Sequence, residues 1–348
     1  MVYYHLLNKI DYSIFFYYPL CSIINIDGEF MKIEKEIKGI IRKCDNVFVS
    51  GHKNLDLDAI GACIGIKAIA KHFKKECYII IDDKEHELGI SKVLEEIKDN
   101  TNIINSADIT NLYKKKSILI IVDTNKAFMI QNDRILHYFN DIIVIDHHQE
   151  TSQTINGINI IKEDRSSTCE MIVDLMNEYG VIPDKEEATY VLSGIVLDTH
   201  NYTKKTSSNT FYASYLLTGV GADPKKVQYY LKEDIKDYII RNKVLMNVKV
   251  VDNYAIAVAK EKEKYRREDL AKIADTLLKF NEIDASFVLG NKIEGDLGIS
   301  ARSEGLVDVG HVLEKLGGGG DIYNAACQMK NTTLKDAEKE LLKALKEE

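Results

Sequence analysis

The sequence predicts an α/β fold, a mostly parallel sheet with helices on both faces, followed by a smaller α+β domain. Aliphatic runs of strand length alternate with helix-length segments over the first two thirds of the chain, which indicates parallel strands joined by helices. Several of these runs end directly at Asp or His, as strands do when they carry chemistry at the carboxyl edge of a sheet. Beyond residue 247 the pattern changes to paired strands with short turns, which indicates a second domain.

The expected elements of the first domain alternate along the chain. Strands are predicted at residues 47–49, 77–81, 117–122 and 141–145. Helices are predicted at residues 33–42, 57–73, 91–98, 168–179, 185–197 and 208–218. The second of these helices contains Gly61, Ala62 and Gly65, small residues that permit a close approach of neighbouring elements.

The chain of 348 residues is long enough for two hydrophobic cores. Four segments are expected: an N-terminal extension outside the fold at 1–30, the first domain at 31–224, a helical connector at 225–246, and the second domain at 247–348. In the second domain the pattern predicts hairpins at 248–259 and 285–300, helices at 268–278, 309–316 and 334–345, and a glycine loop at 317–320.

The composition narrows the classes of partner. A net charge of −8 argues against a broad basic face, so no binding of duplex DNA is expected. The six cysteines are scattered without a Cys-x-x-Cys pair, which predicts reduced thiols in a cytoplasmic protein and no cysteine-based zinc site. The apolar stretch at 13–24 is too short to cross a bilayer and contains Pro19, so no membrane partner is expected; a weak surface anchor is the alternative.

Four clusters of ligand-type residues end apolar runs. They are His52 with Asp56 and Asp58, then Asp123, then Asp146-His147-His148, and finally Asp198. Side chains at the carboxyl ends of neighbouring parallel strands converge on one crevice. Two histidines and four carboxylates meeting there would repel one another unless divalent cations neutralised them. Six ligands with one shared carboxylate suit two ions, and mixed imidazole and carboxylate ligation favours Mn²⁺.

Each cluster also has a structural explanation. Alone, Asp58 would be read as a helix N-cap and Asp123 as a turn residue. Adjacent His147 and His148 after a buried strand are harder to explain by packing, because buried imidazoles need partners. The four clusters together therefore favour the metal interpretation.

The same motifs resemble those of the DHH phosphoesterase superfamily. The resemblance lies in residues 51–62, 122–124, 146–148 and 198–199, and residues 299–303 and 317–320 resemble the substrate-binding domain usually attached to it. The branch most similar is the catalytic module of GdpP-type cyclic di-AMP phosphodiesterases, to which residues 165–170 and 192–199 are also similar. The membrane helices and sensor domains of those proteins are not expected here, so the chain is interpreted as a standalone soluble form.

The resemblance implies a role for each motif residue. His52, Asp56 and Asp123 would hold one Mn²⁺, and Asp58, Asp123, His147 and Asp198 the other. Asp146 would orient His147, and His148 would contact the scissile phosphate or protonate the leaving 3′ oxygen. Substrate contacts are expected from the following residues: Arg302, Ser303, Gly318, Gly319, Gly320 and His200. A homodimer is expected by family analogy alone.

The sequence departs from the family pattern in two places. Asp321 stands where a His usually ends the glycine run, and an N-cap of a helix at 322–327 is its alternative role. Leu55 stands where Pro is usual before Asp56. His200 beside Asp198 is an additional candidate contact, or equally a surface turn residue.

These observations predict a Mn²⁺-dependent phosphodiesterase that cleaves 3′–5′ bonds of cyclic di-AMP, of linear pApA, or of both. One alternative is a nanoRNase or RecJ-like exonuclease that acts on short oligonucleotides. Another, of a different class, is a weakly active nucleotide-binding regulator, which the missing His at position 321 would suit.

Overall fold

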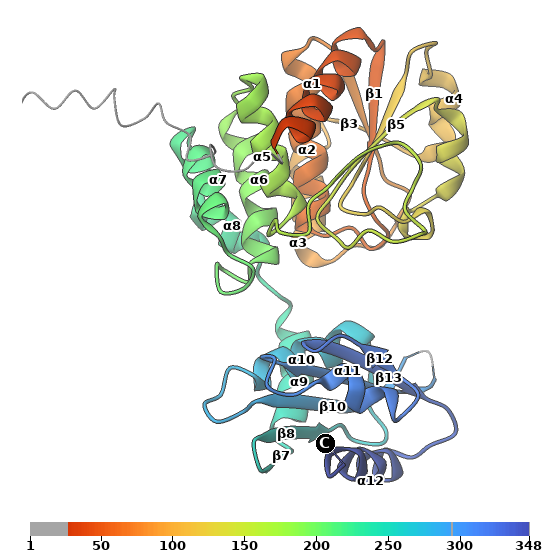
Figure 1. Cartoon of the computed structure of the whole chain (residues 1–348), viewed down its shortest axis with the longest axis vertical. Helices are drawn as coiled ribbons and strands as arrows, with labels where there is room; N and C mark the ends of the chain where they lie inside the picture. The colour runs from red at the N-terminus through yellow and green to blue at the C-terminus, as the bar shows by residue number, and fades with distance from the viewer. Residues whose placement is uncertain (1–26, 294, 348) are drawn as a thin grey trace, which may run out of the picture. The chain divides into compact units, whose positions relative to one another are not determined.

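The structure is a computed structural model that describes residues 27–293 and 295–347, and it divides into two compact units between Lys232 and Glu233 (Figure 1). The division falls inside the predicted connector. Most of the predicted extension, residues 1–26, lies outside the described residues, and helix α1 begins at Asp27. The predicted limits of the four segments stay predictions.

A six-stranded sheet in which every pairing is parallel forms the centre of the first unit. Its strands lie in the order β3-β2-β1-β4-β5-β6. They are β1 (Asn46–Ser50), β2 (Glu76–Ile80), β3 (Asn102–Ile104), β4 (Ile118–Val122), β5 (Asp141–Asp146) and β6 (Ile158–Ile161). The predicted parallel sheet is confirmed, but the short edge strands β3 and β6 were not predicted.

Helices pack mainly on one face of this sheet (Figure 1). The helices of the unit are α1 (Asp27–Lys43), α2 (Leu57–His72), α3 (Leu88–Ile97), α4 (Ile109–Leu112), α5 (Thr168–Tyr179), α6 (Lys185–Asp198), α7 (Ser208–Gly219) and α8 (Pro224–Tyr230). Alternate strand residues divide between two cores: Val47 and Val49 face the larger core with α2, α5 and α6, whereas Phe48 faces a smaller core. Helix α4 and the 3₁₀ turns Ala127–Met129 and Asp133–Tyr138 cover that second face.

Two glycines allow α2, α5 and α6 to pack closely. A Cβ added at Gly61 of α2 would lie 2.7 Å from the Tyr190 carbonyl oxygen of α6. A Cβ added at Gly194 of α6 would lie 2.7 Å from the Cα of Asp58 and 2.5 Å from the Cys169 sulfur. All three distances are too short for real atoms, so glycine is required where these helices position Asp58.

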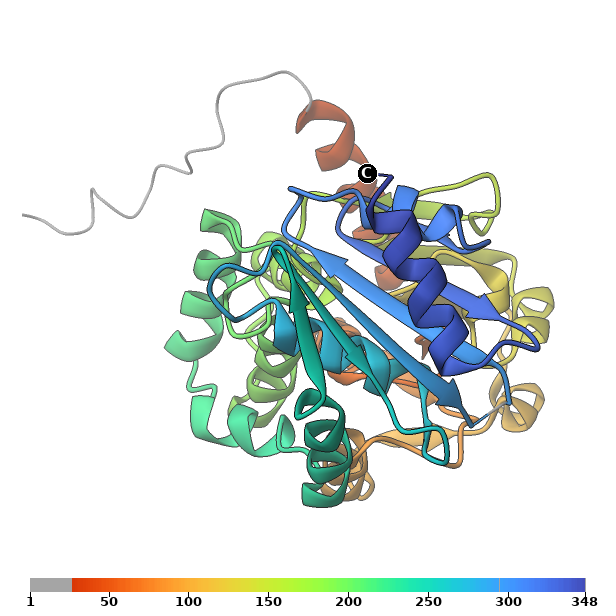
Figure 2. The same ribbon diagram turned by 90° about the horizontal axis from the view of Figure 1, so that it is seen from below.

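The second unit is a mixed sheet with helices on both faces. Its strands are β7 (Val248–Val251), β8 (Tyr254–Val258), β9 (Lys264–Tyr265), β10 (Ala285–Lys292), β11 (Leu297–Ser303), β12 (Gly319–Gly320) and β13 (Asn324–Met329). Its helices are α9 (Ile235–Leu245), α10 (Arg267–Leu277), α11 (Val309–Glu314) and α12 (Leu334–Leu345). Helices α11 and α12 pack on one face and α9 and α10 on the other; Figure 2 shows α12, in dark blue, lying across the strands.

Three details differ from the sequence-based expectations. The connector is two helices, because the Asp234 carboxylate accepts the Lys236 N–H and starts α9 as a new helix. The prediction of a helix at 322–327 is wrong, because the chain forms strand β13 from Asn324 onward. In this strand Ala325 and Cys327 are buried on one side and pair with β11. The second hairpin runs beyond its expected end at residue 300, because β11 continues to Ser303.

Among the helices that the structure describes, none has the length and apolar character needed to cross a membrane. The five cysteines in the described residues are free and buried, while Cys21 lies outside those residues.

Replacing Gly194 with Ala should destabilise the protein by about 1–3 kcal/mol, because the new methyl group overpacks the contact with Asp58 and Cys169. Urea unfolding of the metal-free protein measures the change. Gly39→Ala on α1 is the control, since nothing lies within 4 Å of its added Cβ. A helix-propensity gain of about 0.5–1 kcal/mol is expected there. Equal stability of Gly194→Ala and wild type would contradict the packing argument.

Candidate metal centre

The predicted ligands meet where the strand order of the sheet reverses, between β1 and β4. His52 follows β1, Asp123 follows β4, and His147 follows β5, which is the next strand along. Such a reversal leaves a crevice at the carboxyl ends of the strands, which is where open α/β sheets bind ligands. Asp56 and Asp58, at the start of α2, and Asp198, the last residue of α6, complete the set.

Asp123 lies at the centre of this arrangement. Its Oδ2 is 3.3 Å from Nε2 of His52, and its Oδ1 is 3.5 Å from Nε2 of His147. The residue is buried and adopts a left-handed backbone conformation with φ of 60°, while its N–H donates to the Ile145 carbonyl at 3.0 Å. One carboxylate oxygen of Asp123 therefore faces each histidine.

The predicted ligands fall into two groups, and a third group joins Asp123 and His147 to His148. His52, Asp56 and Asp123 make one group, and Asp58, His147 and Asp198 make the other. Within each group, ligand atoms of all three residues lie within 4.8 Å of one another. Imidazole and carboxylate donors at this spacing can hold a divalent cation.

In the first group, local hydrogen bonds use His52 Nδ1 and Asp56 Oδ1, so that His52 Nε2 and Asp56 Oδ2 can serve as metal ligands. The His52 Nδ1 lies 2.5 Å from the Lys53 carbonyl, which can only accept, so Nδ1 carries the proton and Nε2 faces the carboxylates. Asp56 is the N-cap of α2, and its Oδ1 accepts the N–H groups of Asp58 and Ala59, both at 2.9 Å. Its Oδ2 lies 3.5 Å from His52 Nε2.

The second group is more deeply buried. Both oxygens of the fully buried Asp58 accept backbone N–H groups at the start of α5, from Thr168 at 2.7 Å and Cys169 at 2.8 Å. His147 is buried, and neither of its ring nitrogens has a hydrogen-bond partner among the described residues. Its Nε2 lies 3.2 Å from Asp198 Oδ2. A buried imidazole without hydrogen bonds is unfavourable, and cation ligation would satisfy it, so the residues present fit a metal site.

The electrostatics also favour bound cations. Burial opposes charging of His147, but the carboxylates of Asp123 and Asp198 outweigh it and raise the pKa of His147 to about 11. Burial, together with repulsion from Asp123 and Asp198, raises the pKa of Asp58 well above its usual range. Burial likewise raises the pKa of Asp198 to about 6. In the absence of metal the cluster therefore retains protons that divalent cations would replace.

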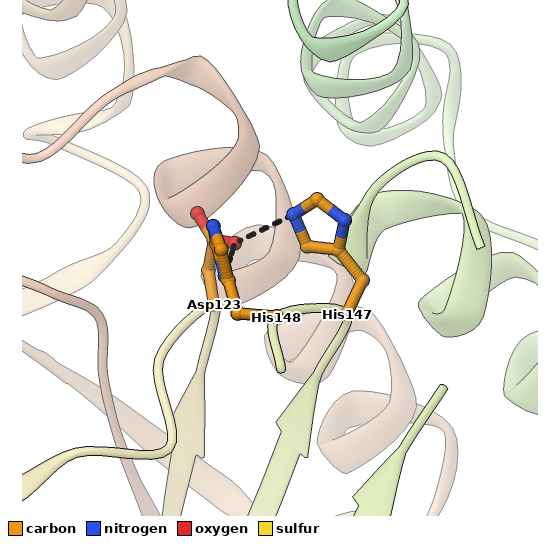
Figure 3. Close-up of side chains that lie close together, drawn as sticks. All are labelled: Asp123, His147 and His148. Carbon is orange, nitrogen blue, oxygen red and sulfur yellow. Dashed lines mark ion pairs between the residues drawn. The ribbon is translucent and has the colours of Figure 1, made fainter. Parts of the chain in front are cut away.

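Asp146 contacts a different histidine from the one expected. Its Oδ1 accepts both the ring Nδ1–H of His148 at 2.8 Å and the backbone N–H of His148 at 3.2 Å. This contact with His148 was not expected, and the orientation of His147 by Asp146 stays a prediction. His148 is 56% exposed, and its Nδ1 is 3.7 Å from Asp123 Oδ1 (Figure 3).

Arg302 and Ser303, the predicted substrate-binding residues on β11, form contacts within the second unit. Arg302 on β11 lies 3.3 Å from Asp275 and donates to the Ala301 carbonyl at 2.9 Å. The Ser303 hydroxyl accepts the N–H groups of Gly305 and Val307. These substrate roles stay predictions.

The glycine run is more ordered than a loop. The Gly318 N–H donates to the Leu313 carbonyl at 2.8 Å, so this amide is already used within the fold, and Gly319 and Gly320 form β12. The Asp321 carboxylate accepts the N–H groups of Tyr323 and Asn324, a local turn in place of the expected helix N-cap. Binding of substrate by Gly318, Gly319 and Gly320 stays a prediction.

His200 is exposed at the end of α6, in a turn where His200, Asn201 and Tyr202 all have positive φ. This turn directly follows Asp198. The structure does not test whether His200 contacts substrate, and that role also stays a prediction.

The sequence did not predict the backbone amides and the hydroxyl that orient Asp58 and Asp123. The amides of Thr168 and Cys169 bind Asp58, and the Thr168 hydroxyl donates to Asp123 Oδ1 at 3.1 Å. The available signal was Ser166-Ser167-Thr168 before a helix, a typical helix N-terminus with free N–H groups.

Comparison with known families agrees with this geometry. The model described as "DHH family, N-terminal domain" matches residues 46–195, and the model "DHHA1 domain" matches residues 252–348. The chain therefore carries a DHH N-terminal domain and a DHHA1 domain.

Curated relatives give a narrower comparison. Cyclic-di-AMP phosphodiesterase PdeA of Listeria monocytogenes is 36% identical over 326 residues, which cover 90% of this chain and 49% of PdeA. Cyclic-di-AMP phosphodiesterase GdpP of Geobacillus thermodenitrificans is 36% identical over 324 residues, which cover 90% of this chain and 49% of GdpP. The chain thus spans about half the length of these relatives.

A solved structure shares the fold. The crystal structure of an exopolyphosphatase-related protein from Bacteroides fragilis superimposes with a TM-score of 0.76 at 20% identity, covering 91% of this chain and 96% of that chain. This likeness confirms the predicted α/β architecture.

Proposed function

We propose that the chain is a Mn²⁺-dependent phosphodiesterase that hydrolyses the 3′–5′ bonds of cyclic di-AMP, and of linear pApA as a second substrate. The observation that carries the proposal is the pair of ligand groups joined by Asp123, with one carboxylate oxygen facing each histidine. The similarity to cyclic-di-AMP phosphodiesterases over 90% of the chain supports the choice of substrate.

The chemistry follows from the donor set. Two bound cations would neutralise charge on a phosphate and lower the pKa of a water molecule near them. The chain supplies the ligands: His52, Asp56 and Asp123 for one cation, with Asp58, His147 and Asp198 for the other and Asp123 between them. Two imidazoles among these donors favour Mn²⁺ over Mg²⁺, which prefers oxygen ligands.

His148 is the candidate acid for the leaving group. Its Nδ1 is held by Asp146, which leaves Nε2 as the nitrogen that can hold and transfer a proton. The ring is 56% exposed beside the buried Asp123, so it can reach a ligand that enters from solvent. We assign His148 Nε2 to the scissile phosphate or to protonation of the 3′ oxygen.

Metal stoichiometry tests the two ligand groups. The wild-type chain should bind about two Mn²⁺ ions, because each group offers three donors and Asp123 serves both. Isothermal calorimetry after chelation and dialysis should show about one ion for His52→Ala, about one for His147→Ala, and severely weakened binding for Asp123→Asn. Asp133→Asn, which removes an exposed carboxylate outside both groups, is the control. Equal stoichiometry in all variants would contradict a shared centre.

Turnover tests the reaction. With Mn²⁺, the chain should hydrolyse cyclic di-AMP and pApA, and Asp123→Asn should lower kcat/KM by about 10³-fold, because both ligand groups lose a donor. Product formation is followed by chromatography, with Asp133→Asn as the control. Hydrolysis of short RNA in preference to both dinucleotides would support the exonuclease alternative. Tight binding of cyclic di-AMP without turnover would support a regulator.

Asp146→Asn tests the contact that the structure shows. The change should lower kcat by about 10²-fold, because the neutral amide holds the His148 ring less firmly than the carboxylate does. Mn²⁺ affinity should stay near wild type, since the hydrogen bonds of Asp146 go to His148 and not to a member of the two ligand groups. Calorimetry and kinetics on the same preparation separate the two effects. A large loss of Mn²⁺ affinity at unchanged kcat would instead return Asp146 to the role of orienting His147.

A further inference from the structure

We infer that Glu170 is a positioning residue for the metal centre, acting through the first turn of α5 on Asp58 and Asp123. The inference rests on the proposed use of metal. Neither Glu170 nor Thr168 belongs to the two ligand groups. They act indirectly: the hydrogen bonds that they make or support fix the orientation of the Asp58 and Asp123 carboxylates.

The first turn of α5 holds both carboxylates. Its Thr168 and Cys169 amides donate to the two oxygens of Asp58, at 2.7 and 2.8 Å. The Thr168 hydroxyl donates to Asp123 Oδ1 at 3.1 Å, the oxygen that also faces His147 Nε2 at 3.5 Å. A shift or rotation of this turn would therefore move one ligand from each group at once.

Glu170 fixes that turn through donors from three directions. The side chain is fully buried. Its Oε1 accepts from the Arg165 guanidinium at 3.0 Å, and its Oε2 accepts from the Ser166 hydroxyl at 2.5 Å and its N–H at 3.3 Å. The Thr210 hydroxyl of α7 donates to the same Oε2 at 2.8 Å. The loop before α5 and the start of α7 are thus tied to one carboxylate.

The network extends to neighbouring elements. Arg165 also pairs with Asp174, one turn further along α5, at 3.1 Å. Thr210 forms the N-terminal capping box of α7 with Ser207. Helix α7 follows the turn that leaves Asp198, and the Tyr202 hydroxyl of that turn donates to the Ser214 hydroxyl of α7 at 2.9 Å. Glu170 therefore links the elements on either side of the second ligand group.

A purely structural role explains this arrangement less well. A buried charged carboxylate must be matched by several donors, and an apolar residue would fill a core position with less desolvation. Here two of the donors, Arg165 and Ser166, belong to the loop that leads directly into Thr168. Outer contacts that orient ligating carboxylates commonly change metal affinity by about 10- to 100-fold when removed.

The test measures Mn²⁺ affinity of the full chain by calorimetry, and thermal unfolding of the same proteins in EDTA. Glu170→Gln and Thr168→Val should each weaken Mn²⁺ binding by about 10- to 100-fold. Thr168→Ser keeps the hydroxyl and should bind near wild type. The matched control is Thr189→Val on α6, where a buried hydroxyl donates to the Lys185 carbonyl and accepts the Asp223 N–H. It should lower the unfolding temperature in EDTA and leave the affinity unchanged.

The outcomes separate this inference from the proposed function. If the wild type binds no Mn²⁺, both are overturned. If the wild type binds and Thr168→Val and Glu170→Gln bind equally well, the inference alone is overturned. It is also overturned if Thr189→Val weakens binding as much as Thr168→Val, because general loosening would then explain the loss. Should Glu170→Gln fail to fold, the comparison of Thr168→Val with Thr168→Ser decides.

Discussion

The geometry of one carboxylate governs the site. Asp123 must present one oxygen to His52 and the other to His147, and it does so from a left-handed backbone conformation at the end of a buried strand. Such a conformation costs about 1–3 kcal/mol in a residue other than glycine, so the surroundings must enforce it. The bond from its N–H to the Ile145 carbonyl and the hydroxyl of Thr168 do this, and the reversal of strand order supplies the crevice.

Close helix packing brings the remaining ligands to Asp123. Asp58 comes from the start of α2 and Asp198 from the end of α6, and these two helices approach closely only because Gly61 and Gly194 lack side chains. The amides at the start of α5 then fix Asp58. Carboxylates held in this way are already oriented in the absence of a cation, so less conformational entropy is lost when one binds.

The sequence predicts the strand ends well, because an aliphatic run that stops at Asp or His leaves few alternatives. It could not assign the partner of Asp146, since the two histidines are adjacent in sequence and their rings lie together, with centroids 4.3 Å apart. Strand β13 was missed because small residues such as Ala325 and Ala326 carry no strong preference until β11 pairs with them. The break in the connector depends on a single cap at Asp234.

The ligands come from positions as distant in sequence as His52 and Asp198, and they belong to loops, strands and helices that would separate on unfolding. Cations shared among them would act as cross-links across most of the first unit, comparable in effect to disulfides that close long loops. The free energy of unfolding of the first unit would then rise with the logarithm of the free metal concentration. Metal supply would govern how long the protein persists as well as how fast it works.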